Sequence, residues 1–145
     1  MIAMTEPAAG PRSLVIEREM PHPPEKVWRA LTERSLIARW LMENDFEPAV
    51  GHKFKVRHAP MPNWSGVTDC EVLTVEPPRH LAYRWHPWEG FETVVSWTLT
   101  PTANGTLLHF EQSGFRPDQQ ANLKGARYGW NKFIGGLEQV TAGLE

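Results

Sequence analysis

A change in the spacing of apolar residues constrains the fold of this chain more than any other feature of its sequence. From Gly51 to Phe115, apolar and polar residues alternate with a period of two, which predicts strands with one buried face. From Asp118 to Leu144, apolar residues instead recur every three or four positions, which predicts one long helix. The sequence therefore predicts consecutive strands followed by a single C-terminal helix.

The alternating segments are short and are separated by proline- and glycine-containing turns. Asn104-Gly105 is a pair that favours a tight hairpin. Strands at such regular spacing are typical of an antiparallel meander, and about six strands are expected after the first helices. The clearest segments cover residues 53–58, 67–75, 81–85, 93–99 and 106–112.

The first third of the chain predicts one more strand and two short helices. Residues 13–20 alternate as a strand, and Pro24 suits the first turn of a helix that reaches Thr32. A second short helix follows over residues 35–41. Helices this short need a surface to pack on. We expect an α+β fold with a curved antiparallel sheet wrapped around the long helix, in a single domain over residues 13–145 behind a flexible tail, residues 1–12.

Composition excludes several classes of protein. The formal net charge of −2 gives no basic face for nucleic acid, and a single cysteine, Cys70, excludes an internal disulfide. No apolar stretch approaches the roughly 20 residues of a membrane span. The first ten residues lack the basic start and apolar run of a secretory signal. These features predict a cytoplasmic protein without a membrane span.

Four stretches of the sequence, in one order, resemble a known family. They are residues 25–32 with Trp40, residues 72–81 with Trp85, Gly105-Thr106 with residues 113–115, and Gly129-Trp130 with Leu137. Together they extend over residues 14–144. The chain resembles the START-like (SRPBCC, helix-grip) superfamily, and within it the group of homologues of the heat-shock protein 90 ATPase activator. The resemblance implies a cavity between sheet and long helix that holds an apolar ligand.

Two departures limit what the resemblance implies. Gln112 stands where many relatives place a histidine, so a role for that imidazole does not transfer. The chain also begins almost directly at the first expected strand, without the additional N-terminal domain of the eukaryotic chaperone activators. A chaperone-related interaction module therefore remains only a further alternative, which no residue of the sequence itself indicates.

Alternation along the strands predicts which side chains face the cavity. For residues 67–75 the facing is left open, because both the odd- and the even-numbered positions carry apolar residues. An aromatic chamber with few polar groups is typical of a small-molecule site. A core filled by side chains is the alternative. The predicted ligand-binding residues are Trp40, Phe54, Val56, His58, Tyr83, Trp85, Val95, Trp97, Leu108, Phe110, Gln112, Gly129, Trp130 and Phe133.

The seven tryptophans of the chain strengthen the prediction of a pocket for an apolar or aromatic molecule, because indoles give rigid apolar area. Trp64 and Trp88 lie in proline-containing loops and are expected at the cavity mouth, or alternatively in an exposed patch for a protein partner. Four glycines interrupt the last helix, for close packing or for ligand space. They are Gly125, Gly129, Gly135 and Gly136.

Catalysis is a second possible function for a chain of this kind. The six histidines show no metal-ligand spacing, and no nucleophile or phosphate-loop motif is present, so neither metal nor cofactor is expected. A cofactor-independent enzyme of the cyclase or hydrolase type would rely on His58, Tyr83 and Gln112 as polar groups around a bound ketone. A monomer or a homodimer is expected.

Overall fold

The alternating segments form one antiparallel sheet of seven strands in a computed structural model that describes residues 13–144. The predicted tail, residues 1–12, lies outside the described residues. The strand order is β1-β7-β6-β5-β4-β3-β2, so β3 to β7 form the predicted meander and β1 joins beside β7. The strands are β1 (Ser13–Met20), β2 (Glu43–Asn44), β3 (Lys53–Arg57), β4 (Val67–Glu76), β5 (His80–Trp88), β6 (Phe91–Thr102) and β7 (Gly105–Ser113).

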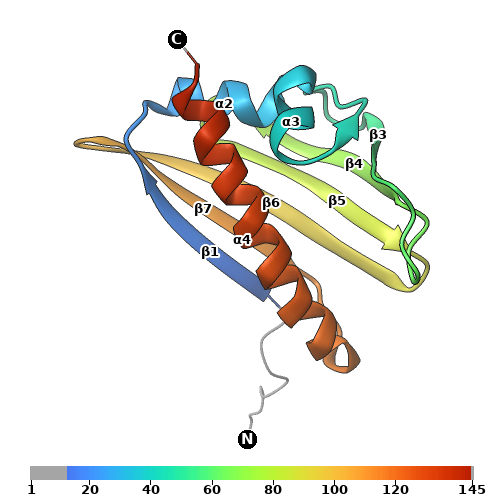
Figure 1. Cartoon of the computed structure of the whole chain (residues 1–145). Helices are drawn as coiled ribbons and strands as arrows, with labels where there is room; N and C mark the ends of the chain where they lie inside the picture. The colour runs from blue at the N-terminus through green and yellow to red at the C-terminus, as the bar shows by residue number, and fades with distance from the viewer. Residues whose placement is uncertain (1–12, 145) are drawn as a thin grey trace, which may run out of the picture.

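Three helices cover one face of this sheet (Figure 1). The long helix α4 (Gln120–Ala142) crosses the sheet, and the short helices α2 (Pro24–Thr32) and α3 (Arg34–Trp40) lie beside its C-terminal end. The predicted α+β helix-grip architecture is therefore confirmed. The start of the last helix differs from the expectation, because a turn of 3-10 helix (Pro117–Gln119) precedes α4.

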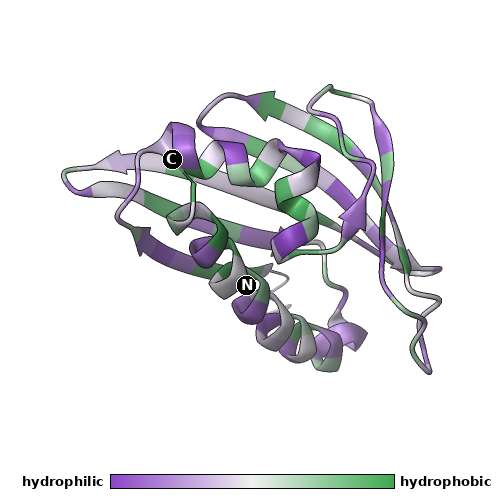
Figure 2. Cartoon of the chain, turned by 45° about the horizontal axis from the view of Figure 1, so that its top comes forward, coloured by the Kyte–Doolittle hydropathy of each residue, from purple (hydrophilic) through white to green (hydrophobic). Residues whose placement is uncertain are grey.

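Burial along the strands follows the predicted alternation, and hydrophobic and hydrophilic residues alternate along the ribbons in Figure 2. The structure also settles the facing of β4, which the sequence left open. Thr68, Cys70 and Val72 face the helices, and a β-bulge between Val72 and Thr74 then shifts the register. Apolar residues therefore occur at both even- and odd-numbered positions of this strand, because the bulge changes which positions face the helices.

The β6–β7 hairpin is as tight as predicted, with Ala103-Asn104 as its two-residue loop and Gly105 as the first residue of β7. Gly105 pairs with Thr102 at the first position of β7 and has a φ of 155°. A Cβ atom at Gly105 would lie 2.1 Å from the carbonyl oxygen of Met20. Glycine is required here because β1 ends directly against the hairpin.

The C-terminal half of α4 packs closely on α3. A Cβ atom at Gly136 would lie 3.4 Å from the Cβ atom of Trp40, whose indole N–H donates to the carbonyl of Ala30 at 2.8 Å. Ile134 and Leu137, on the same part of α4, are fully buried. This end of the space between sheet and helix is therefore filled by side chains, which leaves only the N-terminal half of α4 free to border a pocket.

Candidate functional site: an aromatic pocket beside the last helix

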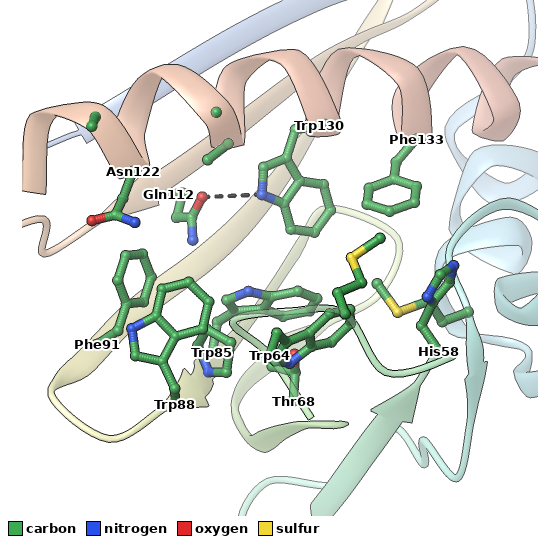
Figure 3. A pocket seen from close by; sticks show the side chains of 17 residues that line it. His58, Trp64, Thr68, Trp85, Trp88, Phe91, Gln112, Asn122, Trp130 and Phe133 are labelled. Carbon is green, nitrogen blue, oxygen red and sulfur yellow. Dashed lines mark hydrogen bonds between the residues drawn. The ribbon is translucent and has the colours of Figure 1, made fainter. Parts of the chain in front are cut away.

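A pocket of about 440 Å³ lies between the N-terminal half of α4 and the sheet (Figure 3). Strands β4 to β7 contribute one wall, α4 the opposite wall, and the β3–β4 loop one side of the mouth. Most of the lining is aromatic or small and apolar. The lining residues are Met42, His58, Met61, Trp64, Thr68, Trp85, Pro87, Trp88, Phe91, Gln112, Ala121, Asn122, Gly125, Ala126, Gly129, Trp130 and Phe133.

Aromatic rings support one another around this pocket. The ring centroid of Trp130 lies 5.1 Å from that of Trp85 on β5 and 5.5 Å from that of Phe133 one turn further along α4. Trp88 and Phe91, at the β5–β6 turn, are 5.0 Å apart. Tilted and edge-on arrangements at such distances are favourable for aromatic pairs. The rings therefore form packed apolar walls around the pocket.

Gln112 is the main polar group of the interior, with only 1% of its surface exposed. Its amide oxygen accepts a hydrogen bond from the indole N–H of Trp130 at 3.0 Å. Its amide nitrogen donates to the hydroxyl of Thr93 at 2.9 Å, and that hydroxyl donates to the carbonyl of Trp85 at 3.3 Å. This chain of hydrogen bonds connects α4, β7, β6 and β5 at one wall of the pocket.

Six of the fourteen predicted site residues line the pocket. They are His58, Trp85, Gln112, Gly129, Trp130 and Phe133. His58 was predicted to point inward, but β3 ends at Arg57 and His58 is exposed. Its ring stacks on Trp64 at 6.0 Å, so it lies at the rim. Trp64 and Trp88 also line the pocket, with Trp88 41% exposed at its mouth.

The other eight predicted residues lie outside this pocket, which corrects their assignment. They are Trp40, Phe54, Val56, Tyr83, Val95, Trp97, Leu108 and Phe110. All are buried, on the predicted face, but side chains fill the space around them. Trp97, for example, lies between Trp40 at 5.6 Å and Phe110 at 4.8 Å. For these residues the alternative of a filled core was the correct one.

Tyr83 is a particular case because the enzymatic alternative depended on it. Its hydroxyl accepts a hydrogen bond from the indole N–H of Trp97 at 3.0 Å, in the core rather than at the pocket. Burial raises the pKa of Tyr83 well above its usual range. Tyr83 therefore stays a neutral phenol that holds Trp97 in place.

Sequence reasoning missed eight lining residues. They are Met42, Met61, Thr68, Pro87, Phe91, Ala121, Asn122 and Ala126, whereas Gly125 had been considered as a position that leaves space for a ligand. The helical ones could have been found, because Ala121, Gly125 and Gly129 follow one another at intervals of four and share a face of α4. Nothing in the sequence indicated Met42 or Met61, whose positions depend on how the loops fold over the sheet.

The lining contains no aspartate, glutamate, lysine or arginine, and His58 is its one titratable side chain. Among residues 13–144, no group of three or more histidine, cysteine, aspartate or glutamate side chains is arranged to hold a metal ion. Within the same range, no helix is both long and apolar enough to cross a membrane. The pocket itself therefore offers apolar contact and hydrogen bonding.

A sheet that grips a long helix beside an apolar pocket defines the START-like (SRPBCC) class, a fold that typically binds small hydrophobic ligands. Residues 21–142 match the model of the family described as "Activator of Hsp90 ATPase homolog 1-like protein" (AHSA1), so the chain belongs to this family. No curated protein matches the chain significantly.

Solved structures with the same fold agree with this assignment. Protein MLL2253 from Mesorhizobium loti is 50% identical, with a TM-score of 0.83 over 92% of this chain and 99% of that one. DynU16, a protein of the dynemicin biosynthetic locus, is 27% identical with a TM-score of 0.79 over 91% of this chain, which spans 48% of DynU16. CalU16 from Micromonospora echinospora, 24% identical, shares the fold, with a TM-score of 0.74 over 90% and 76% of the two chains.

Proposed function

We propose that this protein binds a small, largely apolar or aromatic molecule non-covalently in the pocket between α4 and the sheet. The volume of about 440 Å³ is within the roughly 300–1,000 Å³ of small-molecule sites. The lining combines apolar walls with a few fixed polar groups, which is the usual composition of such sites. Membership of a fold that typically binds hydrophobic ligands supports the same function.

The observation that carries this proposal is the open space beside α4. A Cβ atom placed at Gly125 or Gly129 would meet no other atom within 4 Å outside the helix and its immediate neighbours. At Gly136, two turns further on, the corresponding atom already touches Trp40. Glycine costs a helix roughly 0.5–1 kcal/mol relative to alanine. At Gly125 and Gly129 no close packing offsets that cost, and both glycines line the pocket.

Tryptophan fluorescence provides the direct experiment, because Trp85 and Trp130 both line the pocket. Titration with fatty acids, aromatic polyketides and flavonoids should give saturable quenching by at least one class. Native mass spectrometry of freshly purified protein should reveal any ligand that copurifies. Failure of all three classes to quench, with no copurified mass, is the result that contradicts the proposal.

The two alternatives have less support. Of the three groups on which an enzyme would rely, His58 and Gln112 line the pocket and Tyr83 does not. Trp64 and Trp88 both line the same pocket, which supports a role at its mouth rather than a separate patch for a protein partner. A cytoplasmic location and a monomeric or homodimeric state complete the proposal, to be tested by cell fractionation and light scattering.

A further inference from the structure

The hydrogen bonds behind the pocket can run in one direction only. An indole N–H can donate but not accept, so the atom of Gln112 that faces Trp130 must be its amide oxygen. The amide nitrogen of Gln112 must then face Thr93. Because the carbonyl of Trp85 can only accept, the Thr93 hydroxyl proton is directed toward it and the Thr93 oxygen receives the Gln112 N–H. The orientation of the Gln112 amide is therefore fixed.

This arrangement leaves hydrogen-bond donors at the pocket wall. An amide nitrogen carries two N–H groups, and Gln112 uses one of them among residues 13–144. The indole N–H of Trp85, a side chain only 7% exposed, donates to no residue in that range. Buried indole N–H groups usually have a partner. Figure 3 shows both nitrogen atoms turned toward the interior of the pocket.

The Trp85 donor is not sealed inside the protein. Among the described residues, Thr102 Oγ1 is the one side-chain nitrogen or oxygen atom that is both inaccessible to solvent and without a hydrogen-bond partner, and it lies outside this pocket. The Trp85 N–H is therefore reachable from the pocket, and so is the hydroxyl of Thr68, which is 1% exposed overall and also lacks a hydrogen bond. The buried part of the wall offers two pure donors and one hydroxyl, and Asn122 on α4, an exposed side chain, adds an amide group with both a donor and an acceptor.

The charge of the lining also indicates which ligands fit the pocket. No aspartate, glutamate, lysine or arginine lines the pocket, and the one imidazole of the lining, His58, lies at the rim. Burying an ionised group without a partner of opposite charge is strongly unfavourable. A carboxylate would find no cation in the interior, and an ammonium group would find no anion. An uncharged molecule is the chemistry that fits.

We propose that the ligand is an uncharged, planar aromatic ketone whose carbonyl oxygen accepts hydrogen bonds from Trp85 Nε1–H and from the free N–H of Gln112. This inference rests on the proposed function and specifies its ligand class. A carbonyl oxygen has two lone pairs and no hydrogen, and so matches two donors. Flat ring systems match the aromatic walls formed by Trp64, Trp85 and Trp130. Trp85 is therefore a specificity-determining residue.

Four small molecules test the proposal by equilibrium dialysis. Fluorenone and fluorene have the same planar ring system and differ in the carbonyl oxygen. Dihexyl ketone has the same number of carbon atoms as fluorenone and a carbonyl, but no ring, and fluorenone carboxylate adds a negative charge. We expect the Kd of fluorenone to be at least about tenfold lower than that of fluorene, the ratio that one or two net hydrogen bonds give. Its Kd should also be lower than that of dihexyl ketone, which lacks the planar rings, and than that of the carboxylate, whose charge would be buried without a partner.

Two tryptophan variants assign the donor. Trp85→Phe keeps an aromatic ring and removes the N–H, and should lower the Kd ratio of fluorene to fluorenone from about tenfold to about threefold, because the N–H of Gln112 remains. Trp64→Phe is the matched control, because Trp64 lines the same pocket but its N–H already donates to the carbonyl of Val67 at 3.0 Å. In this variant the ratio should remain about tenfold.

A measurement on the unaltered protein makes the test independent of the folding of either variant. The carbonyl stretching frequency of bound fluorenone should lie below its value in an apolar solvent. Equal Kd values for fluorenone and fluorene, or an unshifted frequency, overturn the assignment of the donors while the proposed function stands. Tightest binding of the carboxylate or of dihexyl ketone overturns the ligand class. Binding of none of the four, nor of any ligand in the fluorescence titration, overturns the proposed function as well.

Discussion

Trp130 donates its indole N–H to the amide oxygen of Gln112 at 3.0 Å and so joins α4 to β7 at the wall of the pocket. Both side chains are almost fully buried, with 4% and 1% of their surface exposed. In such surroundings an unpaired polar group costs more than a paired one contributes. The pair therefore fixes the direction of the Trp130 ring, which is the largest side chain that α4 contributes to the pocket lining.

Replacing Gln112 tests this relationship. Gln112→Met keeps a similar volume but leaves the Trp130 N–H without an acceptor, so we expect the free energy of unfolding to fall by about 1–3 kcal/mol. Urea denaturation measures the change. Trp130→Phe combined with Gln112→Met removes both partners, and the double variant should lose less than the sum of the two single losses. Strict additivity would contradict a direct hydrogen bond.

Gly129 and Gly136 form a matched pair on one helix. Gly129→Leu should remove ligand binding, because its side chain enters the pocket, while the free energy of unfolding stays equal or rises by up to about 1 kcal/mol from helix propensity. Gly136→Leu should have the opposite effect. It overpacks against Trp40 and should cost about 1–3 kcal/mol.

Thermal unfolding and fluorescence titration of both variants check this pair. The Gly136 position is outside the pocket lining, so its variant should still bind ligand at a temperature where it is folded. A Gly129→Leu protein that is clearly less stable than the parent and still binds ligand would show that the pocket does not extend to this part of α4.

The predicted faces of β3, β5, β6 and β7 were correct because one face of the sheet is covered and the other is exposed. A period of two shows which face of a strand is buried, but not where along the strand the helices that cover this face end. Trp85 and Trp97 point the same way, yet Trp85 lines the pocket whereas Trp97 is covered by Trp40 from α3. That difference depends on where α3 rests on the sheet. It is set by tertiary packing between residues distant in sequence, which alternation does not encode.

The two predictions that concerned element ends were less accurate for a related reason. Alternation continues through His58, but the strand stops at Arg57, and the chain then turns into the loop that carries Trp64. Asp118 was expected to cap the start of the last helix, but it belongs to the preceding 3-10 turn and its carboxylate contacts Arg116 at 3.4 Å. Side-chain contacts of this kind decide where elements end and are not periodic.

Cys70 provides a prediction about chemical reactivity. Its thiol is buried on the inner face of β4, and burial, followed by the nearby negative charge of Asp69, raises the pKa of Cys70 far above its usual range. Because the thiolate is the reactive form, iodoacetamide at pH 8 should modify the folded protein at least about tenfold more slowly than the urea-unfolded chain. Mass spectrometry follows the reaction. Equal rates in the two states would contradict the buried position of this thiol.

His109 makes stability depend on pH. Its Nδ1 lies 2.7 Å from Glu17 Oε2 and its Nε2 3.5 Å from Glu111 Oε1, and the hydrogen bond to Glu17 is the main reason that the pKa of His109 is raised above 6.5. The folded state thus favours the charged imidazole. The stabilisation is complete below the unfolded-state pKa, about 6.5, and is lost as pH rises through the higher folded-state pKa.

The loss of that stabilisation can be measured against a variant without the imidazole. The free energy of unfolding of the parent should exceed that of His109→Gln by more at pH 6 than at pH 9. Glu17→Gln, which keeps the imidazole and removes its main partner, should lower the pKa of His109 as followed by NMR of the ring protons. Glu17 lies opposite His109 on the neighbouring strand β1, and Glu111 lies on β7, the strand of His109 itself, so these two carboxylates face the imidazole. A His109 pKa at or below 6.5 in the parent protein would contradict this account, because the stability difference would then stay constant or grow as pH rises.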